Sequence, residues 1–192
     1  RREAGGELKA RDATHLRVRA FLVALGFGFA AALLAAGKED LLPPKPTRYV
    51  TDRTGVLPSD RAEQLNAKLE KYEQDTSNQL IVWIGRSVPE NFTLEEFTVQ
   101  AARKWAAGQA GKNNGIVLFV FPGDRKMRIE VGYGLEGSLT DFRSKQILST
   151  VVKPHFRQRD FNGGIEAGVA AIQRPANTKP KRRRPSPWRP DA

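Results

Sequence analysis

The chain has 192 residues, a formal net charge of +11 and no cysteine, which excludes disulfides, thiolate metal sites and a cysteine nucleophile. Only two histidines are present and one lies near the N-terminus, which argues against a catalytic triad or a multi-histidine zinc site. Residues 20–173 carry a net charge of only +2, and we expect no nucleic-acid partner, because nucleic-acid-binding domains carry their positive charge on the fold itself.

An apolar segment near the N-terminus predicts export. Residues 20–37 carry no charged side chain, follow a basic stretch and end in small residues, which is the arrangement of a signal peptide. The segment is also long enough to serve as a membrane anchor. We therefore expect residues 1–19 to be a basic arm, residues 20–37 a signal peptide or membrane anchor, and residues 38–47 a proline-rich linker. Positive charge before the apolar segment predicts an extracytoplasmic location, periplasmic or at the cell surface, for the remaining chain.

A folded domain is predicted to begin with a short extended segment at residues 49–52. Apolar residues then recur at three- and four-residue spacing over residues 60–76, which predicts a helix that Asp60 opens as part of a capping box. Residues 79–84 are apolar on both faces after Gln79, as in a strand that is buried on both faces. A second capping box opens a helix over residues 93–108.

The second half of the domain repeats this alternation. Residues 116–121 predict another strand buried on both faces, and a turn signal joins it to residues 126–131, which alternate as in an edge strand antiparallel to its neighbour. A helix with Phe142 on its apolar face follows, and Pro154 ends or kinks it. The last helix spans residues 161–172. These elements predict an α/β fold, a three-layer α/β/α sandwich with a small mixed sheet and helices on both faces.

Three glycines follow the last strand. Gly132, Gly134 and Gly137 match the dinucleotide-binding fingerprint G-x-G-x-x-G. That motif requires a buried, parallel first strand and a helix whose N-terminus meets the pyrophosphate. Here the preceding strand is amphipathic and the last of the sheet, and the helix begins late, near Thr140. We therefore interpret the glycines as a turn that needs positive φ or a close approach of two backbones.

Acidic residues around this segment suggest a second hypothesis. Glu136 and Asp141 lie at its exit, Asp124 lies in the preceding hairpin, and Asp52 ends the first extended segment. Ligand sets made only of oxygen select hard cations such as Ca²⁺ or Mg²⁺. Simpler interpretations are a helix-terminal acid for Asp141, a solvated side chain for Glu136 and a turn former for Asp124. Asp52 follows a strand and is harder to explain in this way.

Five short segments stand in a fixed order along residues 48–173. They are Tyr49–Asp52 with Gly55–Leu57, Trp105–Gly108, Asn114–Leu118, Arg128–Gly137 and Pro154–Phe156. Together they resemble the TPM domain family, sometimes labelled thylakoid-lumen phosphatase-like. The resemblance spans every predicted element of the domain, and an export signal ahead of the domain is the family's usual arrangement. At the C-terminus the chain departs from many bacterial relatives, because residues 174–192 are basic and proline-rich and predict a disordered tail.

The resemblance implies an α/β/α sandwich in an extracytoplasmic, often membrane-tethered protein. Plant members are tied to photosystem II repair and have been assigned a weak acid phosphatase activity, and some members bind Ca²⁺ through acids near one end of the sheet. By position, Asp52 matches the family's first aspartate, Glu136 and Asp141 match the acids of its glycine segment, and Asp124 matches a variable hairpin position. The resemblance thus implies these four side chains as ligands of Ca²⁺, with Mg²⁺ less favoured.

Two functions follow from these observations. The first is a non-enzymatic, Ca²⁺-stabilised accessory module that contacts a membrane or a membrane-protein partner. The second is a weak metal-dependent phosphatase that acts on phosphoesters, with Asp52 or Asp141 as ligand or base. The lack of a catalytic histidine and of a recognised nucleophile motif favours the first function.

Overall fold

The computed structural model describes residues 41–176, of which residues 44–176 belong to one folded unit. The predicted basic arm and the predicted signal peptide or anchor lie outside the described residues, as does most of the predicted tail. Within residues 41–176, none of the helices has the length and apolarity needed to cross a membrane.

Strands and helices alternate along the unit. In chain order the elements are β1 (Val50–Asp52), α2 (Ser59–Thr76), β2 (Gln79–Ile84), α3 (Leu94–Trp105), β3 (Gly115–Phe121), β4 (Lys126–Val131), the 3₁₀ turn η1 (Tyr133–Leu135), α4 (Asp141–Ile147), the π-helical turn η2 (Leu148–Val152), α5 (Lys153–Arg157) and α6 (Phe161–Ala176). Every predicted strand and helix is therefore present. Helix α6 includes residues 174–176, the first residues of the predicted tail of residues 174–192.

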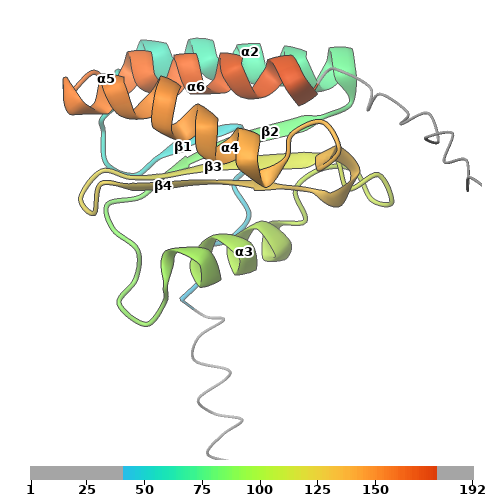
Figure 1. The fold of residues 1–192 in the computed structure, drawn as a ribbon, viewed down its shortest axis with the longest axis horizontal. Coiled ribbons are helices and arrows are strands. Elements are labelled where there is room, and N and C mark those ends of the chain that lie inside the picture. The colour runs from blue at the N-terminus through green and yellow to red at the C-terminus, as the bar shows by residue number, and fades with distance from the viewer. Residues whose placement is uncertain (1–40, 177–192) are drawn as a thin grey trace, which may run out of the picture. The chain divides into compact units, whose positions relative to one another are not determined.

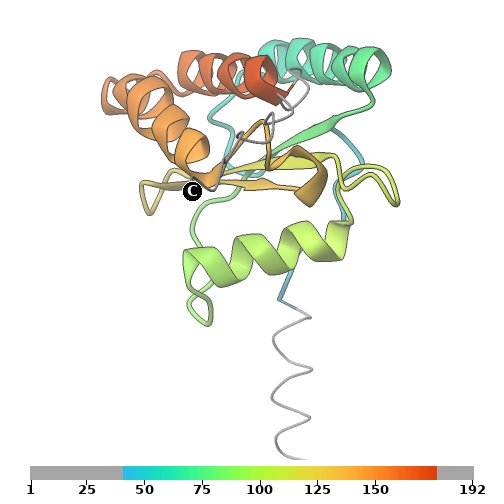
Figure 2. The same ribbon diagram turned by 45° about the vertical axis from the view of Figure 1, so that its right-hand side comes forward.

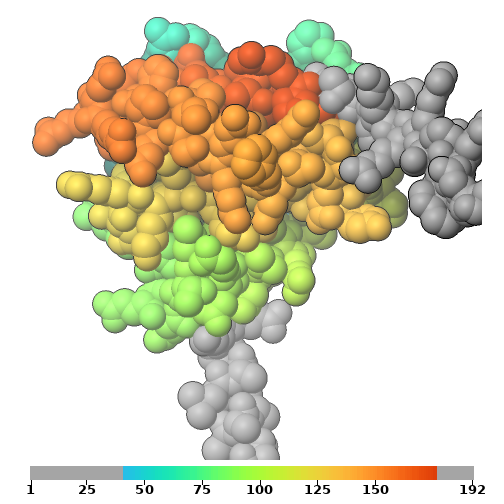
Figure 3. Space-filling view, in the orientation of Figure 1, coloured from blue at the N-terminus to red at the C-terminus, as the bar shows by residue number. Residues whose placement is uncertain are grey.

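The strands form one sheet in the order β1-β2-β3-β4. Strands β1, β2 and β3 are parallel, and β4 is antiparallel to β3. The prediction of an antiparallel edge strand over residues 126–131 is confirmed. Helices α2, α4, α5 and α6 cover one face of the sheet and α3 covers the other (Figures 1 and 2), so the three-layer α/β/α sandwich is confirmed as well. Figure 3 shows the same layers with their side chains, from the orange helical layer to the green α3.

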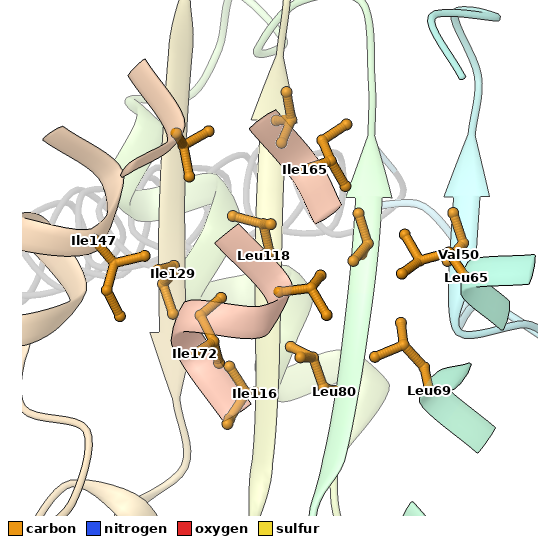
Figure 4. Close-up of a cluster of buried hydrophobic side chains, with 14 of the residues drawn as sticks. Val50, Leu65, Leu69, Leu80, Ile116, Leu118, Ile129, Ile147, Ile165 and Ile172 are labelled. Atoms are coloured by element: carbon orange, nitrogen blue, oxygen red, sulfur yellow. The ribbon is translucent and has the colours of Figure 1, made fainter. Parts of the chain in front are cut away.

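The two faces of the sheet bury different side chains. Under α2 and α6 the core is aliphatic, with Leu65 and Leu69 of α2 beside β1 and β2, and Ile165 and Ile172 of α6 over β3 (Figure 4). Under α3 the core is aromatic and consists of Trp83, Phe92, Phe97, Trp105, Phe119 and Phe121. Because alternate residues of β2 and β3 supply the two cores, both strands carry apolar side chains on both faces, as their sequences predicted.

Two local predictions need correction. The capping box at Asp60 is wrong, because Pro58 is the N-cap of α2 and no side chain caps this helix. The box at Thr93 is confirmed: its hydroxyl accepts a hydrogen bond from Glu96 N, and the Glu96 carboxylate accepts one from Thr93 N. Pro154 does not end the helix, because the π-helical turn η2 leads directly into α5, where Pro154 lies in the first turn.

The connections between the parallel strands have an unusual geometry. The order β1-β2-β3 places both connections in the same direction across the sheet, yet α2 lies on the aliphatic face and α3 on the aromatic face. Handedness depends on which face the connecting helix covers, so one of the two crossovers must be left-handed, whereas about 98% of such crossovers are right-handed. As a result, the chain leaves the carboxyl ends of β1 and β2 toward opposite faces.

Candidate functional site

Asp52 organises the loop between β1 and α2. Its Oδ1 accepts hydrogen bonds from Thr54 N at 2.7 Å, Thr54 Oγ1 at 2.7 Å and Gly55 N at 3.0 Å. Its Oδ2 accepts one from Leu57 N at 2.9 Å. The half-buried carboxylate thus holds four donors of its own loop, and this turn geometry explains an acid at the end of β1.

Asp124 connects two loops at the same end of the sheet. Its Oδ2 accepts a hydrogen bond from Val88 N at 2.8 Å, which joins the β3–β4 hairpin to the loop after β2. A second link joins these segments, because Gly123 N donates to Arg86 O at 2.9 Å. Asp124 is therefore more than a turn former, since it fastens the hairpin to the neighbouring loop.

Glu136 and Asp141 lie elsewhere. Asp52 stands level with Ile84, Val120 and Met127 across the sheet, whereas β4 runs on to Val131 at the opposite strand ends before Glu136 follows. Strands β1 and β4 form the two edges, which strand spacing places roughly 14 Å apart. Asp141 is exposed in the first turn of α4 and contacts Lys145 at 4.0 Å.

The structure therefore separates the four acids that were expected to act together. Asp52 and Asp124 lie at the carboxyl end of the parallel strands. Glu136 follows the C-terminal end of β4, at the opposite end of the sheet, and Asp141 lies in the first turn of α4. No group of three or more histidine, aspartate or glutamate side chains is placed to hold a metal ion within residues 41–176. These acids do not fit one shared Ca²⁺ site, and Ca²⁺ binding stays a prediction.

The glycine segment turns tightly around the loop before β3. A Cβ atom at Gly132 would lie 2.2 Å from Asn113 O, and one at Gly134 would lie 2.2 Å from Lys112 O. The interpretation as a close approach of two backbones is confirmed at these two positions. Gly132 N donates to Gly115 O at 2.8 Å and Gly134 N donates to Asn113 O at 3.0 Å. This segment, residues 132–142, is called the glycine corner below.

Two aromatic side chains project from the glycine corner. Tyr133 is 80% exposed and Phe142 is 75% exposed, and they are the most exposed large apolar side chains of the described chain. The prediction that Phe142 lies on a buried face is wrong. The buried stripe of α4 runs through Ser144 and Ile147, and Phe142 lies five residues, or about 140°, from Ile147. That angular offset is the sequence signal that could have identified Phe142 as exposed.

A polar network fastens β4 to α3. Arg128 Nε lies 2.5 Å from Glu130 Oε1, and the buried Thr98 hydroxyl donates to the same oxygen at 2.6 Å. Arg128 also pairs with Glu95 of α3 at 3.2 Å. Burial alone would lower the pKa of Arg128, but its hydrogen bond and ion pair with Glu130 raise it. The alternating pattern of β4 predicted that Arg128 and Glu130 face outward into solvent. In the structure α3 covers both side chains, and each is half-buried.

Asp160 holds the start of α6 together with the only histidine of the described chain. Its Oδ2 lies 2.7 Å from His155 Nδ1, and its Oδ1 accepts a hydrogen bond from Gly163 N at 2.8 Å. The hydrogen bond from His155, followed by that from Gly163, lowers the pKa of Asp160 below its ordinary value of 3.8. The pair therefore stabilises the ionised carboxylate at the N-terminus of a helix.

The lowered pKa of Asp160 gives a pH prediction. Its stabilising contribution is fully present above pH 3.8 and is lost as the pH falls through the lowered folded-state value. We expect Asp160→Asn to lower the melting temperature near neutral pH, and we expect this deficit to shrink as the pH falls below 3.8 toward the lowered folded-state pKa of Asp160. Melting curves across this range test it, with exposed Glu90→Gln as the control. A melting deficit of Asp160→Asn that stays constant as the pH falls below 3.8 would contradict the assignment.

Comparisons with known proteins agree with this fold. A family model of the TPM domain matches residues 50–174. The N-terminal domain of a protein from P. gingivalis, solved by NMR in solution, has 35% sequence identity and a TM-score of 0.62, and the match covers 67% of this chain and 82% of that one. No match was found among curated proteins.

Two further NMR structures share the fold at lower identity. The N-terminal domain of the cg2496 protein from Corynebacterium glutamicum has 18% identity and a TM-score of 0.53, covering 73% of this chain and 89% of that one. The BA42 protein from Bizionia argentinensis has 14% identity and a TM-score of 0.57, covering 68% and 90%. The family model spans β1 to α6, and the resemblance carried by the five sequence segments is confirmed. The chain belongs to the TPM domain family.

Proposed function

We propose that this TPM domain is a non-enzymatic accessory module that binds a membrane-protein partner outside the cytoplasm. The observation that carries the proposal is the exposure of Tyr133 and Phe142 on the glycine corner. Exposed aromatic side chains can serve as anchors for a protein partner, and tyrosine is enriched among the residues that dominate binding energy. The glycine corner is also rigid, because its backbone is bonded to the loop at Asn113 and Gly115.

The arrangement of the acids supports a binding role over catalysis. Asp52, the best candidate for a ligand or base, has both carboxylate oxygens engaged by its own loop. A side chain that must hold a metal or move a proton would first have to release these donors. The alternative of a metal-dependent phosphatase rests on family resemblance, and no contact among residues 41–176 favours it.

The test is site-specific photo-crosslinking of the full chain in membranes of its host. A photoreactive residue at position 142 is expected to crosslink to a membrane protein, and Tyr133→Ala is expected to weaken that crosslink, since dominant interface residues contribute about 2 kcal/mol or more. A photoreactive residue at Lys68, exposed on α2, is the matched control and is expected to give no such product. Equal crosslinking from both positions, or crosslinks from position 142 to lipid alone, would contradict the proposal.

A further inference from the structure

The carboxyl end of the sheet is strongly basic. Exposed cations come from four separate segments: the loop after β1, the loop after β2, the β3–β4 hairpin and the α5–α6 connection. These residues, called the basic end below, are Arg53, Arg86, Arg125, Lys126, Arg157 and Arg159. None of them takes part in an ion pair among residues 41–176.

Backbone contacts place the strand loops at one end. Arg53 N donates to Ile84 O at 2.9 Å, and Arg86 O accepts from Gly123 N at 2.9 Å, so the loop after β2 lies between the loop after β1 and the hairpin. Arg125 follows in the hairpin with a φ of 55°, a left-handed conformation that tightens the turn. These three arginines therefore extend across the sheet from β1 to the hairpin.

Helix α6 brings the remaining cations to the same end. Its last residue, Ala176, accepts a hydrogen bond from Asn78 just before β2, at the amino end of the parallel strands. The helix has 16 residues and is about 24 Å long, slightly longer than the strands, so it begins at their carboxyl end. Figures 1 and 3 show α5 and the hairpin together on the left of the molecule.

The nearby acids do not neutralise these cations. Asp52 and Asp124 accept hydrogen bonds from backbone N–H groups of the fold, and Asp160 pairs with His155. The ion pairs at the start of α2 are Asp60–Arg61 and Glu63–Arg48. The exposed acids of these loops are Asp160, which pairs with His155, and Glu90, against six exposed cations in the basic end. The outward charge of this end is therefore positive.

We propose that the basic end docks on the anionic headgroups of a lipid bilayer. The cations lie on four segments across the width of the sheet, and the loops after β1 and β2 leave toward opposite faces, so the guanidinium groups form a broad array and not a single cradle. Arginine binds phosphate oxygens with paired donors, and each basic residue near an anionic membrane contributes to attraction. None of the six side chains is aromatic or aliphatic, so this surface differs in chemical character from the glycine corner, which lies at the opposite strand ends.

Amide hydrogen exchange of the full chain bound to vesicles tests the proposal, because it reports on the loops even if another segment holds the chain on the membrane. On vesicles that contain phosphatidylglycerol, we expect slower exchange in the loops at residues 53–57, 85–88, 122–126 and 157–160 than on vesicles of phosphatidylcholine alone. High salt should abolish the difference, since the attraction is electrostatic. The glycine corner should exchange at the same rate on both vesicles.

The variant with Arg53→Gln, Arg86→Gln and Arg125→Gln should lose this protection. A matched variant with Lys68→Gln, Arg103→Gln and Lys112→Gln removes the same charge from exposed positions on α2, on α3 and before β3, and it should keep the protection. Protection that survives in the first variant, or equal exchange on the two kinds of vesicle, would overturn the proposal. Protection of the same loops by duplex DNA but not by anionic vesicles would also overturn it.

Discussion

Replacing Phe97 with alanine is expected to lower the free energy of unfolding by about 3–5 kcal/mol, the range measured for large aromatic residues removed from cores. Phe97 is only 1% exposed, and its ring lies in the centre of the aromatic core between α3 and the sheet. The ring centroids of Trp83 and Phe121 lie 5.8 Å and 5.7 Å from that of Phe97, and those of Phe92 and Phe119 lie 5.8 Å and 6.3 Å away. Neighbours held on two strands and on the loop before α3 cannot close the resulting cavity.

Urea unfolding followed by tryptophan fluorescence measures the loss, because Trp83 and Trp105 belong to the same aromatic core. Phe142→Ala is the matched control: it removes the same side chain from a position that is 75% exposed, and the free energy of unfolding should change by less than about 0.5 kcal/mol. If Phe142→Ala destabilised the domain as much as Phe97→Ala, the assignment of Phe142 to an exposed surface on the glycine corner would be contradicted. The pair thus tests the core and the proposed partner surface together.

Most of the fold follows from local patterns in the sequence. Strands β2 and β3 carry apolar side chains on both faces because both faces are covered, and the spacing of apolar residues in α2 and α6 sets which side chains meet the sheet. The edge position of β4 follows from its alternation and from the turn at Pro122–Arg125. These signals are local, and each concerns a segment shorter than about 20 residues, which is why they can be recognised without the structure.

The features that were missed depend on contacts between distant segments. Alternation alone predicted that Glu130 faces solvent, but α3, more than 30 residues earlier, covers it through Thr98. Helices α2 and α3 cover opposite faces of the sheet because each face has its own core. The left-handed crossover follows from that placement. The same reason separates Asp52 from Glu136. A shared site for these acids would require the segment after β4 to turn back toward β1. Strand β4 instead forms the opposite edge of the sheet.

Replacing Asp52 with alanine is expected to lower the free energy of unfolding by about 2–4 kcal/mol, because a carboxylate that accepts several hydrogen bonds contributes more than a neutral acceptor and its donors are left unpaired. Four donors of the β1–α2 loop depend on this side chain. One of them is the backbone N–H of Leu57, whose side chain is buried in the aliphatic core, so the loss should loosen the start of α2. Asp52→Asn should have a smaller effect, since the amide retains one acceptor oxygen but presents a donor where Leu57 N needs an acceptor.

Thermal or urea unfolding with and without Ca²⁺ separates this structural role from a role as a metal ligand. If Asp52 serves its own loop, the destabilisation of Asp52→Ala is the same in both conditions; if it holds Ca²⁺, the loss is larger when Ca²⁺ is present. Asp60→Asn is the control, because Asp60 is exposed and its side chain makes no capping bond on α2, so its stability should stay within about 0.5 kcal/mol of the unchanged protein. A loss that appeared only with Ca²⁺ would make Asp52 a ligand of Ca²⁺ and contradict its assignment to the loop alone. An equal loss in both conditions would leave the aspartate at the end of β1 explained by the turn it closes.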